Sequence, residues 1–425
     1  MDANRFVTRS LRDARVLRIL AAALDAVEPG AAVRRYLEEH PISHTGRLFG
    51  LSIGKAALPM LDALNGLVPL DGGLAIAKHA SFRPPGLLTV MESGHPVPDA
   101  RSLAAGEAAL EFVSRLGADD LLICLISGGG SALMTAPFIP LEDMQALTSA
   151  LLACGARIDE INTLRRHLDR VKGGGLARAA HGASILSLIL SDVVGDSLEA
   201  IASGPTAPDP TTRRGALDIL RKYKLGGDIP ASVFETMQET LKPGDPIFSR
   251  VQNAVIASNQ IALQAALRQA ELEGFHIISP ITDLQGEARE VGRDLASRLR
   301  VATLGKRRPF CMAAGGETTV TLHGLHSRGR GGRNQELALA AIPELTGLED
   351  VMLVSLATDG EDGPTDAAGA VATGESLQRA ETLGLDAAGH LSRNDAYPFF
   401  DGLGDLIRSG PSGTNVNDLV LMFAF

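Results

Sequence analysis

The order of hydrophobic and polar residues along this chain predicts alternating strands and helices. Short apolar runs end in glycine or serine, and helical patterns follow them. Three examples are "RLFGLSIGKAALPMLDAL" (47–64), "DDLLICLISGGGSALM" (119–134) and "GASILSLILSDVVGD" (182–196). This rhythm predicts α/β layering with mostly parallel strands, and such sheets bind ligands at the turns that follow their strands.

Strand-led patterns continue beyond a stretch, 209–246, that is richer in proline, glycine and charge. We expect two short helices in this stretch and a domain junction near its end. The later patterns include "AVIASNQIALQAAL" (254–267) and "GTNVNDLVLMF" (413–423). A length of 425 residues is typical of two or three domains, and we expect two, over 1–245 and 246–425.

Composition and charge narrow the class of protein. Hydrophobic residues make up 45% of the chain and charged residues 21%, which argues against disorder and against a membrane fold. The net charge of −10 and the absence of a long basic stripe argue against a nucleic-acid partner. No secretory signal or bilayer-spanning run is present, so we expect a cytoplasmic protein without a membrane partner. The three cysteines are expected to be core thiols.

Three glycines follow the second apolar run and form a candidate anion site. Gly128, Gly129 and Gly130 precede Ser131 and a helix start, a pattern that suits a backbone nest for phosphate oxygens. A tight turn without a ligand explains the same residues equally well. The nicotinamide fingerprint fails here because Leu133 stands where a glycine or alanine is needed.

Cationic residues stand at two predicted helix starts. Lys55 follows a strand and begins a helix, which suits contact with a phosphoryl or carboxylate group, although it does not complete a P-loop motif and a surface lysine is the alternative. The stretch "HSRGRGGRNQELALAA" (326–341) carries Arg328, Arg330 and Arg333 on a glycine-rich loop. Arginine forks at such a loop suit a small anion, and we expect Asn334 and Glu336 to cap the helix.

Acidic residues complete the set. Asp192 and Asp196 lie in "SDVVGD", Asp359 and Asp362 lie in "TDGEDGPTD", and Asp418 lies in "NVNDL". One or two such carboxylates suffice to hold Mg²⁺ beside a nucleotide, while Asp-Gly pairs are also frequent in plain turns. An anionic substrate, a polyphosphate and a divalent ion together are the parts of phosphoryl transfer.

Nine sequence blocks resemble those of the class II glycerate kinases, which join a glycerate kinase amino-terminal domain to a MOFRL carboxyl-terminal domain. The blocks are "SIGKAA" from Ser52, "SGHPVPD" from Ser93, "LISGGGSAL" from Leu125, "INTLRRHLDRVKGGGLA" from Ile161, "SDVVGDSLEAIASGPTAPD" from Ser191, "GGETTVTL" from Gly315, "GRGGRNQELAL" from Gly329, "ATDGEDGPTDAAGA" from Ala357 and "GPSGTNVNDL" from Gly410. The blocks occur in the family's order, and the resemblance extends over almost the whole chain. The resemblance implies a Rossmann-like layered first domain, a smaller second domain and a cleft between them, in which ATP phosphorylates D-glycerate to 2-phosphoglycerate.

The resemblance also implies roles for individual residues. The family's transfer residues fall on Lys55, Arg333 and Asp192, and its nucleotide cradle falls on Ser127, Gly128, Gly129, Gly130 and Ser131. We assign the glycerate carboxylate to Arg333, helped by Arg330 and Lys55, because a paired fork fixes which hydroxyl faces the phosphate. Asp192 is either the general base or, with Asp196, a holder of Mg²⁺, and the sequence does not separate these roles.

Two rival functions stay open at this point. Relatives of the family sometimes carry the label hydroxypyruvate reductase, which is an NAD(P)H-dependent activity. A non-catalytic protein that binds a nucleotide or a sugar acid is the second rival, although we see no DNA-binding helix pair or interaction repeat in the sequence. The sequence also leaves open whether the protein is a monomer or a homodimer.

Overall fold

The apolar runs in the first half of the chain form a six-stranded sheet with the order β3-β2-β1-β4-β5-β6. The pairings from β3 through β5 are parallel. The strands are β1 (Leu48–Ile53), β2 (Gly72–Ala77), β3 (Leu88–Glu92), β4 (Leu121–Ile126), β5 (Ser184–Leu190) and β6 (Val251–Ala257). This strand order is that of doubly wound dinucleotide-binding sheets, so the predicted Rossmann-like layering of this region is confirmed.

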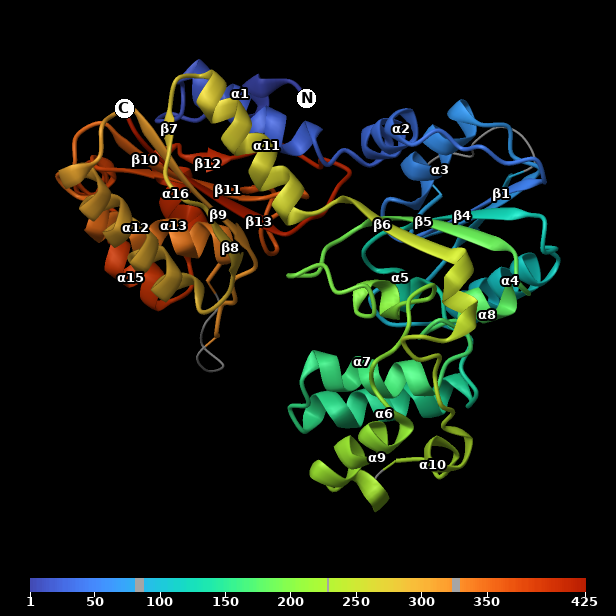
Figure 1. The fold of residues 1–425 in the computed structure, drawn as a ribbon. Helices are drawn as coiled ribbons and strands as arrows, with labels where there is room; N and C mark the ends of the chain where they lie inside the picture. The colour runs from blue at the N-terminus through green and yellow to red at the C-terminus, as the bar shows by residue number, and fades with distance from the viewer. Residues whose placement is uncertain (81–87, 228, 323–328) are drawn as a thin grey trace. The chain divides into compact units, whose positions relative to one another are not determined.

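Helices cover both faces of this sheet (Figure 1). On one face lie α2 (Pro29–Glu39) and α3 (Ala57–Leu67), and on the other lie α4 (Ala100–Ser114), α5 (Gly130–Leu133) and α8 (Gly175–Ala179). The central strands are buried on both faces, as their continuous apolar runs predict. Asp99 caps α4 through the backbone N–H groups of Arg101 and Ser102.

A helical group extends this region. Its members are α6 (Leu141–Ala153), α7 (Ile158–His167), α9 (Arg213–Lys222) and α10 (Ser232–Thr236), with short 3₁₀ turns η2 (Ile201–Ser203), η3 (Leu225–Gly227) and η4 (Pro246–Arg250) around them. Leu147, Leu164 and Leu220 belong to their shared apolar core. The two short helices expected between 209 and 246 are therefore confirmed as α9 and α10.

The second sheet has seven strands, with the order β12-β11-β10-β13-β9-β7 and with β8 beside β9. Its strands are β7 (His276–Ile277), β8 (Ile281–Leu284), β9 (Phe310–Gly316), β10 (Val351–Ala357), β11 (Gly369–Thr373), β12 (Leu406–Ile407) and β13 (Asp418–Ala424). The expectation of mostly parallel strands is wrong here, because β13 pairs antiparallel with both β9 and β10. The chain's last strand enters between two strands that a crossover helix connects, which strand-by-strand patterns do not reveal.

Helices cover both faces of this second sheet as well (Figure 1). They are η1 (Ala3–Phe6), α1 (Ala14–Asp25), α11 (Asn259–Leu272), α12 (Ala288–Gly305), α13 (Arg333–Leu345), α14 (Ser376–Thr382), α15 (Ala387–Ser392) and α16 (Ala396–Leu403). Helix α13 is buried along most of its length and packs on β10 and β11. Most of its side chains are therefore held by the core.

The chain divides into two units, Pro29–Ile256 and Met1–Glu28 with Ala257–Phe425. These come from a computed structural model that describes residues 1–80, 88–227, 229–322 and 329–425. The division differs from the expected boundary at 245 and 246, because α1 packs on α11 and Arg18 forms a fork with Glu273, with N–O distances of 2.7 and 2.6 Å. The local sequence of an amino-terminal helix does not indicate that the helix packs with a unit formed by the end of the chain.

The cysteines only partly match their predicted role as core thiols. Cys124 and Cys311 are buried, and burial raises the pKa of each thiol to about 12. Cys154 is exposed, which contradicts the prediction. Cys154 follows the last residue of α6, and the last buried residue of that helix is Leu151. The apolar residues that precede Cys154 in sequence therefore do not bury it.

Candidate functional site

The register of the parallel sheet brings three predicted loops to one edge. Ile53 of β1 pairs with Ile126 of β4, and Ile126 pairs with Ile189 of β5. The residues that follow these strands therefore leave the sheet at the same level. The glycine loop, residues 127–131, lies between the loop of Lys55 and the loop of Asp192, and this is the carboxyl edge at which ligands of such sheets bind.

The loops of β1 and β4 touch through their backbones. The Lys55 N–H donates to the Gly128 carbonyl oxygen at 2.9 Å, and the Ser127 hydroxyl accepts from the Ala56 N–H at 3.1 Å. Gly54 has a φ of +120°, and a Cβ atom there would lie 2.5 Å from the Ser127 carbonyl oxygen. Only glycine therefore permits this contact.

Asp192 reaches the glycine loop from the neighbouring strand end. A Cβ atom on Gly128 would overlap the Asp192 carboxylate, so the absence of a side chain at residue 128 makes room for that carboxylate. Asp192 also has a polar or charged interaction partner, so its carboxylate is not free. The structure thus brings together Lys55, the glycine loop and Asp192, three groups that the sequence predicted separately.

The Lys55 ammonium is available for an anion. The side chain is exposed, and no hydrogen bond or ion pair to its Nζ occurs among residues 1–80, 88–227, 229–322 and 329–425. Its charge is felt by His95: burial, with the charges of Lys55 and Lys78, lowers the pKa of that imidazole. His95 is therefore neutral at physiological pH, and Lys55 carries the positive charge here.

The donors at the end of β5 suit a divalent ion only in part. Asp192 and Asp196 belong to one loop, in which Gly195 and Asp196 both have positive φ. One or two carboxylates are enough for Mg²⁺ when phosphate oxygens and water supply the other ligands. No group of three or more histidine, cysteine, aspartate or glutamate side chains is arranged to hold a metal within the described part of the chain. These residues therefore fit an ion that arrives with a nucleotide rather than a closed protein cage.

Arg333, the first residue of α13, lies in a cluster of acidic side chains. Its Nε and Nη2 donate to the two carboxylate oxygens of Asp418 at 2.6 and 3.0 Å, and its Nη1 donates to Glu317 at 2.6 Å. A guanidinium has five N–H groups, so two, one on each Nη, are left over within the described residues. Arg333 therefore retains N–H groups for a substrate, although a different carboxylate occupies its Nε side.

Burial changes the acidity of the carboxyls near Arg333. Burial raises the pKa of Asp418 to about 6, against the lowering effect of Arg333. Burial also raises the pKa of Asp362 to about 7, although its carboxylate accepts from the N–H groups of Asn334 and Gln335 at 3.1 and 2.9 Å. Asp362 thus caps α13 from a distant loop.

This cap replaces the one expected from the sequence. Gly332 is the N-cap residue of α13 and provides no side chain, so the predicted capping by Asn334 and Glu336 is wrong. Glu336 instead forms buried bonds with Arg289 and Asn394. The loop of Asp362 contacts the first turn of α13, and the sequence around α13 does not predict this contact.

Arg330 is held less firmly than Arg333. Its guanidinium lies 3.8 Å from the centre of the Tyr397 ring, and one nitrogen lies 3.6 Å from Asp366. Half of its side chain is exposed. Arg328, from the same glycine-rich stretch, lies outside the described residues.

Sequence reasoning missed Glu317 as a partner of Arg333. Glu317 belongs to the block "GGETTVTL", whose two glycines are the last residues of β9. A single glutamate after a strand has no distinctive spacing, so the sequence did not mark it as a site residue. The pairing of Asp418 with Arg333 was also missed, because 85 residues separate the two in the chain. Charge pairs of this kind are visible only in three dimensions.

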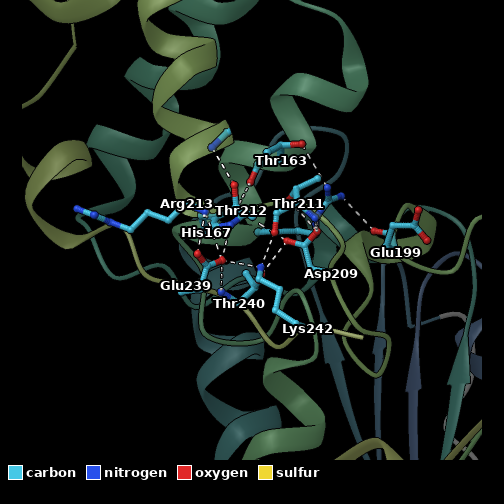
Figure 2. A network of polar contacts seen from close by, with 12 residues as sticks. Thr163, His167, Glu199, Asp209, Thr211, Thr212, Arg213, Glu239, Thr240 and Lys242 are labelled. Carbon is cyan, nitrogen blue, oxygen red and sulfur yellow. Dashed lines mark hydrogen bonds and ion pairs between the residues drawn. The ribbon is translucent and has the colours of Figure 1, made fainter. Parts of the chain in front are cut away.

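A second polar network joins α7 to the loops beside α9 and α10 (Figure 2). The buried His167 donates from Nδ1 to the Thr163 carbonyl oxygen at 2.9 Å, and its Nε2 lies 3.3 Å from Glu239 Oε1. Arg166 pairs with Asp209 at 3.1 Å. Thr240 donates to the other Asp209 oxygen at 3.0 Å. The network fastens the helical group to the sheet region and leaves His167 with protein partners.

Comparisons with known proteins identify related sequences and structures. A family described as "Domain of unknown function (DUF4147)" matches residues 15–238, and the MOFRL family matches residues 310–418. A glycerate 2-kinase of Pyrococcus horikoshii is 38% identical, over 95% of this chain and 96% of that protein. A "putative hydroxypyruvate reductase" of Agrobacterium vitis is 40% identical, over 95% and 92%.

A solved structure also matches closely. The crystal structure of a glycerate kinase from Thermotoga maritima superposes with a TM-score of 0.89 at 39% identity and covers 96% of this chain and 98% of that chain. None of the helices in the described ranges has the length and apolar character that crossing a membrane requires.

Proposed function

This chain belongs to the glycerate kinase family, and we propose on that premise that it transfers the γ-phosphoryl group of ATP to the 2-hydroxyl group of D-glycerate. The single observation that supports this most strongly is the convergence of Lys55, the glycine loop and Asp192 at the carboxyl edge of one sheet. These groups offer a cation, a backbone cradle and a carboxylate to a polyphosphate.

In this proposal the loop 127–131 binds the phosphates of ATP through its backbone N–H groups. Lys55 neutralises charge on the phosphoryl group during transfer, a contact that contributes ~3 kcal/mol to the transition state. Loss of that contact slows turnover on the order of 10²-fold. The Lys55 ammonium, which has no hydrogen-bond or ion-pair partner among the residues that the structure describes, supports this assignment.

Asp192 has one of two roles in this reaction. In one role its carboxylate contacts the substrate hydroxyl, and in the other it contacts a metal ion. As a general base it accepts the proton of the 2-hydroxyl group. As a metal holder, Asp192 would bind Mg²⁺ together with Asp196, and the ion would neutralise phosphate charge. Its position against Gly128 supports a role close to the phosphates.

Arg333 holds the carboxylate of glycerate in this proposal, and Arg330 assists it. The two N–H groups that Asp418 and Glu317 leave over provide the donors. Glu317 is the more exposed of the two partners, with 42% of its side chain exposed against 6% for Asp418, so its bond holds the guanidinium less firmly. Asp418 keeps the guanidinium in orientation.

Several expectations from the sequence remain predictions. They include the meeting of ATP and glycerate in a cleft between the two domains, a cytoplasmic location and a monomeric or homodimeric state. The rival reductase activity has one observation in its favour, the name of the Agrobacterium vitis relative. Oxidation of NADH in the presence of hydroxypyruvate and purified protein tests that rival by absorbance.

Phosphorus NMR of the product tests the proposed reaction. Protein, ATP, Mg²⁺ and D-glycerate should give ADP and the signal of 2-phosphoglycerate. A signal of 3-phosphoglycerate contradicts the proposed position of transfer, and the absence of any phosphorylated acid contradicts the activity.

Replacing Lys55 with alanine tests its assigned role. We expect Lys55→Ala to lower kcat on the order of 10²-fold while ATP binding by calorimetry persists. Lys306→Ala is the matched control, because Lys306 is an exposed lysine of the other unit. Wild-type turnover in the Lys55 variant refutes the assignment.

A further inference from the structure

A cavity of about 540 Å³ opens beside the glycine loop, within the unit Pro29–Ile256. Ser131 of the loop lines it, together with the segment 96–98 and with Leu141 and Met144 of α6. Cavities of roughly 300–1,000 Å³ with mostly apolar walls bind ligands of drug size. A three-carbon acid fills only a small part of such a space.

Two large apolar side chains are exposed where they line this cavity. Val97 and Leu152 each have 64% of their surface exposed, and both belong to the cavity lining. Single exposed apolar residues are common, but two beside one apolar cavity form a continuous surface. Such a surface suits a flat, weakly polar group such as a nucleobase.

Asp169 and Lys172 form a buried pair in the lining, with an N–O distance of 2.6 Å. Lys172 also donates to the Met134 carbonyl oxygen at 3.2 Å, and Thr135 donates to Asp169 at 2.5 Å. The two charges compensate each other and their hydrogen bonds are satisfied. This pair therefore adds no net charge to the cavity.

Arg165 brings a second positive charge to the cavity lining. The carboxylate of Asp169 attracts it, but Asp169 forms its ion pair with Lys172. The neighbours of Arg165 in sequence have partners: Arg166 pairs with Asp209 and Arg170 pairs with Glu107. The Arg165 guanidinium forms no hydrogen bond or ion pair in the part of the chain that the structure describes, although the residue is half-buried. One carboxylate, Asp169, thus faces two cations, Lys172 and Arg165, and the excess positive charge at a half-buried position favours an anionic ligand.

We propose that this cavity holds the nucleoside part of the bound nucleotide, with the base against Val97 and Leu152 and with Arg165 on the phosphate chain that continues to Ser131. The proposal rests on the proposed kinase function, because that function supplies ATP. The volume favours the nucleotide over glycerate, and the excess of positive charge of Arg165 and Lys172 over Asp169 matches its phosphates.

Replacing Arg165 with methionine in the full-length protein tests the charge. Calorimetry with ADP should show a dissociation constant about 10- to 100-fold higher, the effect of losing a charge-assisted hydrogen bond. The KM for ATP should rise with it, while the KM for glycerate at saturating ATP stays at the wild-type value. Arg165→Lys should recover part of the ADP affinity, because it restores the charge without the fork.

Arg221→Met is the matched control, because Arg221 is an exposed arginine of α9 that pairs with Asp218 and does not line the cavity. Its ADP affinity should equal that of the wild type. Unfolding temperatures of all variants show whether each protein is folded before its affinity is compared.

Replacing Leu152 with glutamate tests the apolar surface. We expect Leu152→Glu to weaken ADP binding about tenfold, because it places a negative charge where the base and phosphates approach. Ile158→Glu is the control, since Ile158 is 67% exposed in the same helical group and does not line the cavity.

The outcomes separate this proposal from the proposed function. Unchanged ADP affinity in both cavity variants overturns the subsite, even if the wild-type protein phosphorylates glycerate. A rise in the KM for glycerate alone also overturns it and assigns the cavity to the acid. ADP binding that depends on Arg165, in a wild-type protein that does not phosphorylate glycerate, supports the subsite and refutes the kinase activity.

Discussion

The glycine loop and the Arg333 cluster are built in opposite ways. Around Gly54 and Gly128 the chain brings backbones together by omitting side chains, and the resulting bonds join N–H groups to carbonyl and hydroxyl oxygens. Around Arg333 the structure depends on long charged side chains, with Asp418 and Glu317 at 2.6 Å. Both regions suit an anionic substrate by different means.

The difference predicts how each region fails. A loop made of backbone is sensitive to an added atom, because the neighbouring carbonyl cannot move aside. A cluster made of charges is sensitive to a removed partner, because the remaining charge is left buried. The variants below test this distinction in order of expected effect.

The largest effect is expected from Gly54→Ala. The added Cβ meets the Ser127 backbone, with 2.7 Å to its carbonyl carbon, and alanine also disfavours a φ of +120°. We expect a loss of about 3–5 kcal/mol in the free energy of unfolding, together with loss of activity. Urea unfolding followed by circular dichroism measures it, since the chain has no tryptophan for fluorescence.

Gly66→Ala provides the comparison for that variant. Gly66 lies in α3, directly after the Gly54 loop, and a Cβ there meets nothing within 4 Å. We expect a gain of up to about 1 kcal/mol from the better helix propensity of alanine. Equal stability of the two variants contradicts the steric account of the loop.

Arg333→Ala should have the next largest effect. Removal of the guanidinium leaves the buried Asp418 without its charged partner, which should cost about 3 kcal/mol of unfolding free energy and most of the glycerate phosphorylation. The double variant Arg333→Met with Asp418→Asn should recover much of the stability but none of the activity. If Arg333→Ala has the wild-type kcat/KM for glycerate, the cluster serves only to stabilise the fold.

A smaller effect concerns pH. The pKa of Asp362 is raised to about 7, so between pH 4 and 7 the folded protein keeps a proton that the unfolded chain has lost. The contribution to stability is therefore present at low pH and lost as pH rises through 7. We expect Asp362→Asn to lessen the fall in unfolding free energy between pH 5 and 8 by on the order of 2 kcal/mol.

Urea unfolding at several pH values measures this change. Asparagine accepts one helix N–H through its single amide oxygen and loses the second bond, so the variant removes the titration and keeps part of the cap of α13. The slope with pH, rather than the absolute stability, is therefore the quantity compared. The matched control is Asp366→Asn, because Tyr397 and Arg408 lower the pKa of that more exposed carboxyl. A wild-type protein whose dependence on pH equals that of the Asp362 variant contradicts the raised pKa.

The smallest effect is expected from Ser131→Ala. Its hydroxyl shares a hydrogen bond with Ser203 at 2.8 Å, which is worth about 1 kcal/mol to stability. Ser203→Ala breaks the same bond from the other side. If Ser131 also contacts the nucleotide, only its own variant should raise the KM for ATP, by a few-fold, and identical KM values in the two variants count against that contact.

Much of the first region was predictable from sequence. The strand and helix patterns around 47–64 and 119–134 predicted β1, α3 and β4, and the parallel arrangement of these strands then places their turns at one edge. Lys55 and Asp192 were named from those turns alone. This worked because in a parallel sheet the position after each strand is set by the fold class.

Less of the second region was predictable. The order of hydrophobic residues predicted strands and the helix after the arginine loop, but not that β13 enters antiparallel between β9 and β10. It therefore did not bring Asp418 to Arg333 or Asp362 to the start of α13. Arg165 lies in the block "INTLRRHLDRVKGGGLA", but only the structure shows that Asp169 is paired with Lys172 and that Arg165 forms no ion pair within the described residues.

The sequence by itself thus determined the α/β layering, the family, and most residues of the candidate site, because periodicity, glycine turns and ordered blocks are local properties of the chain. The tertiary structure alone decided which charges are neighbours, which carboxyls are buried and that Arg165 forms no ion pair within the described residues. Those properties depend on contacts between residues far apart in sequence, and burial shifts a pKa only once those contacts have formed.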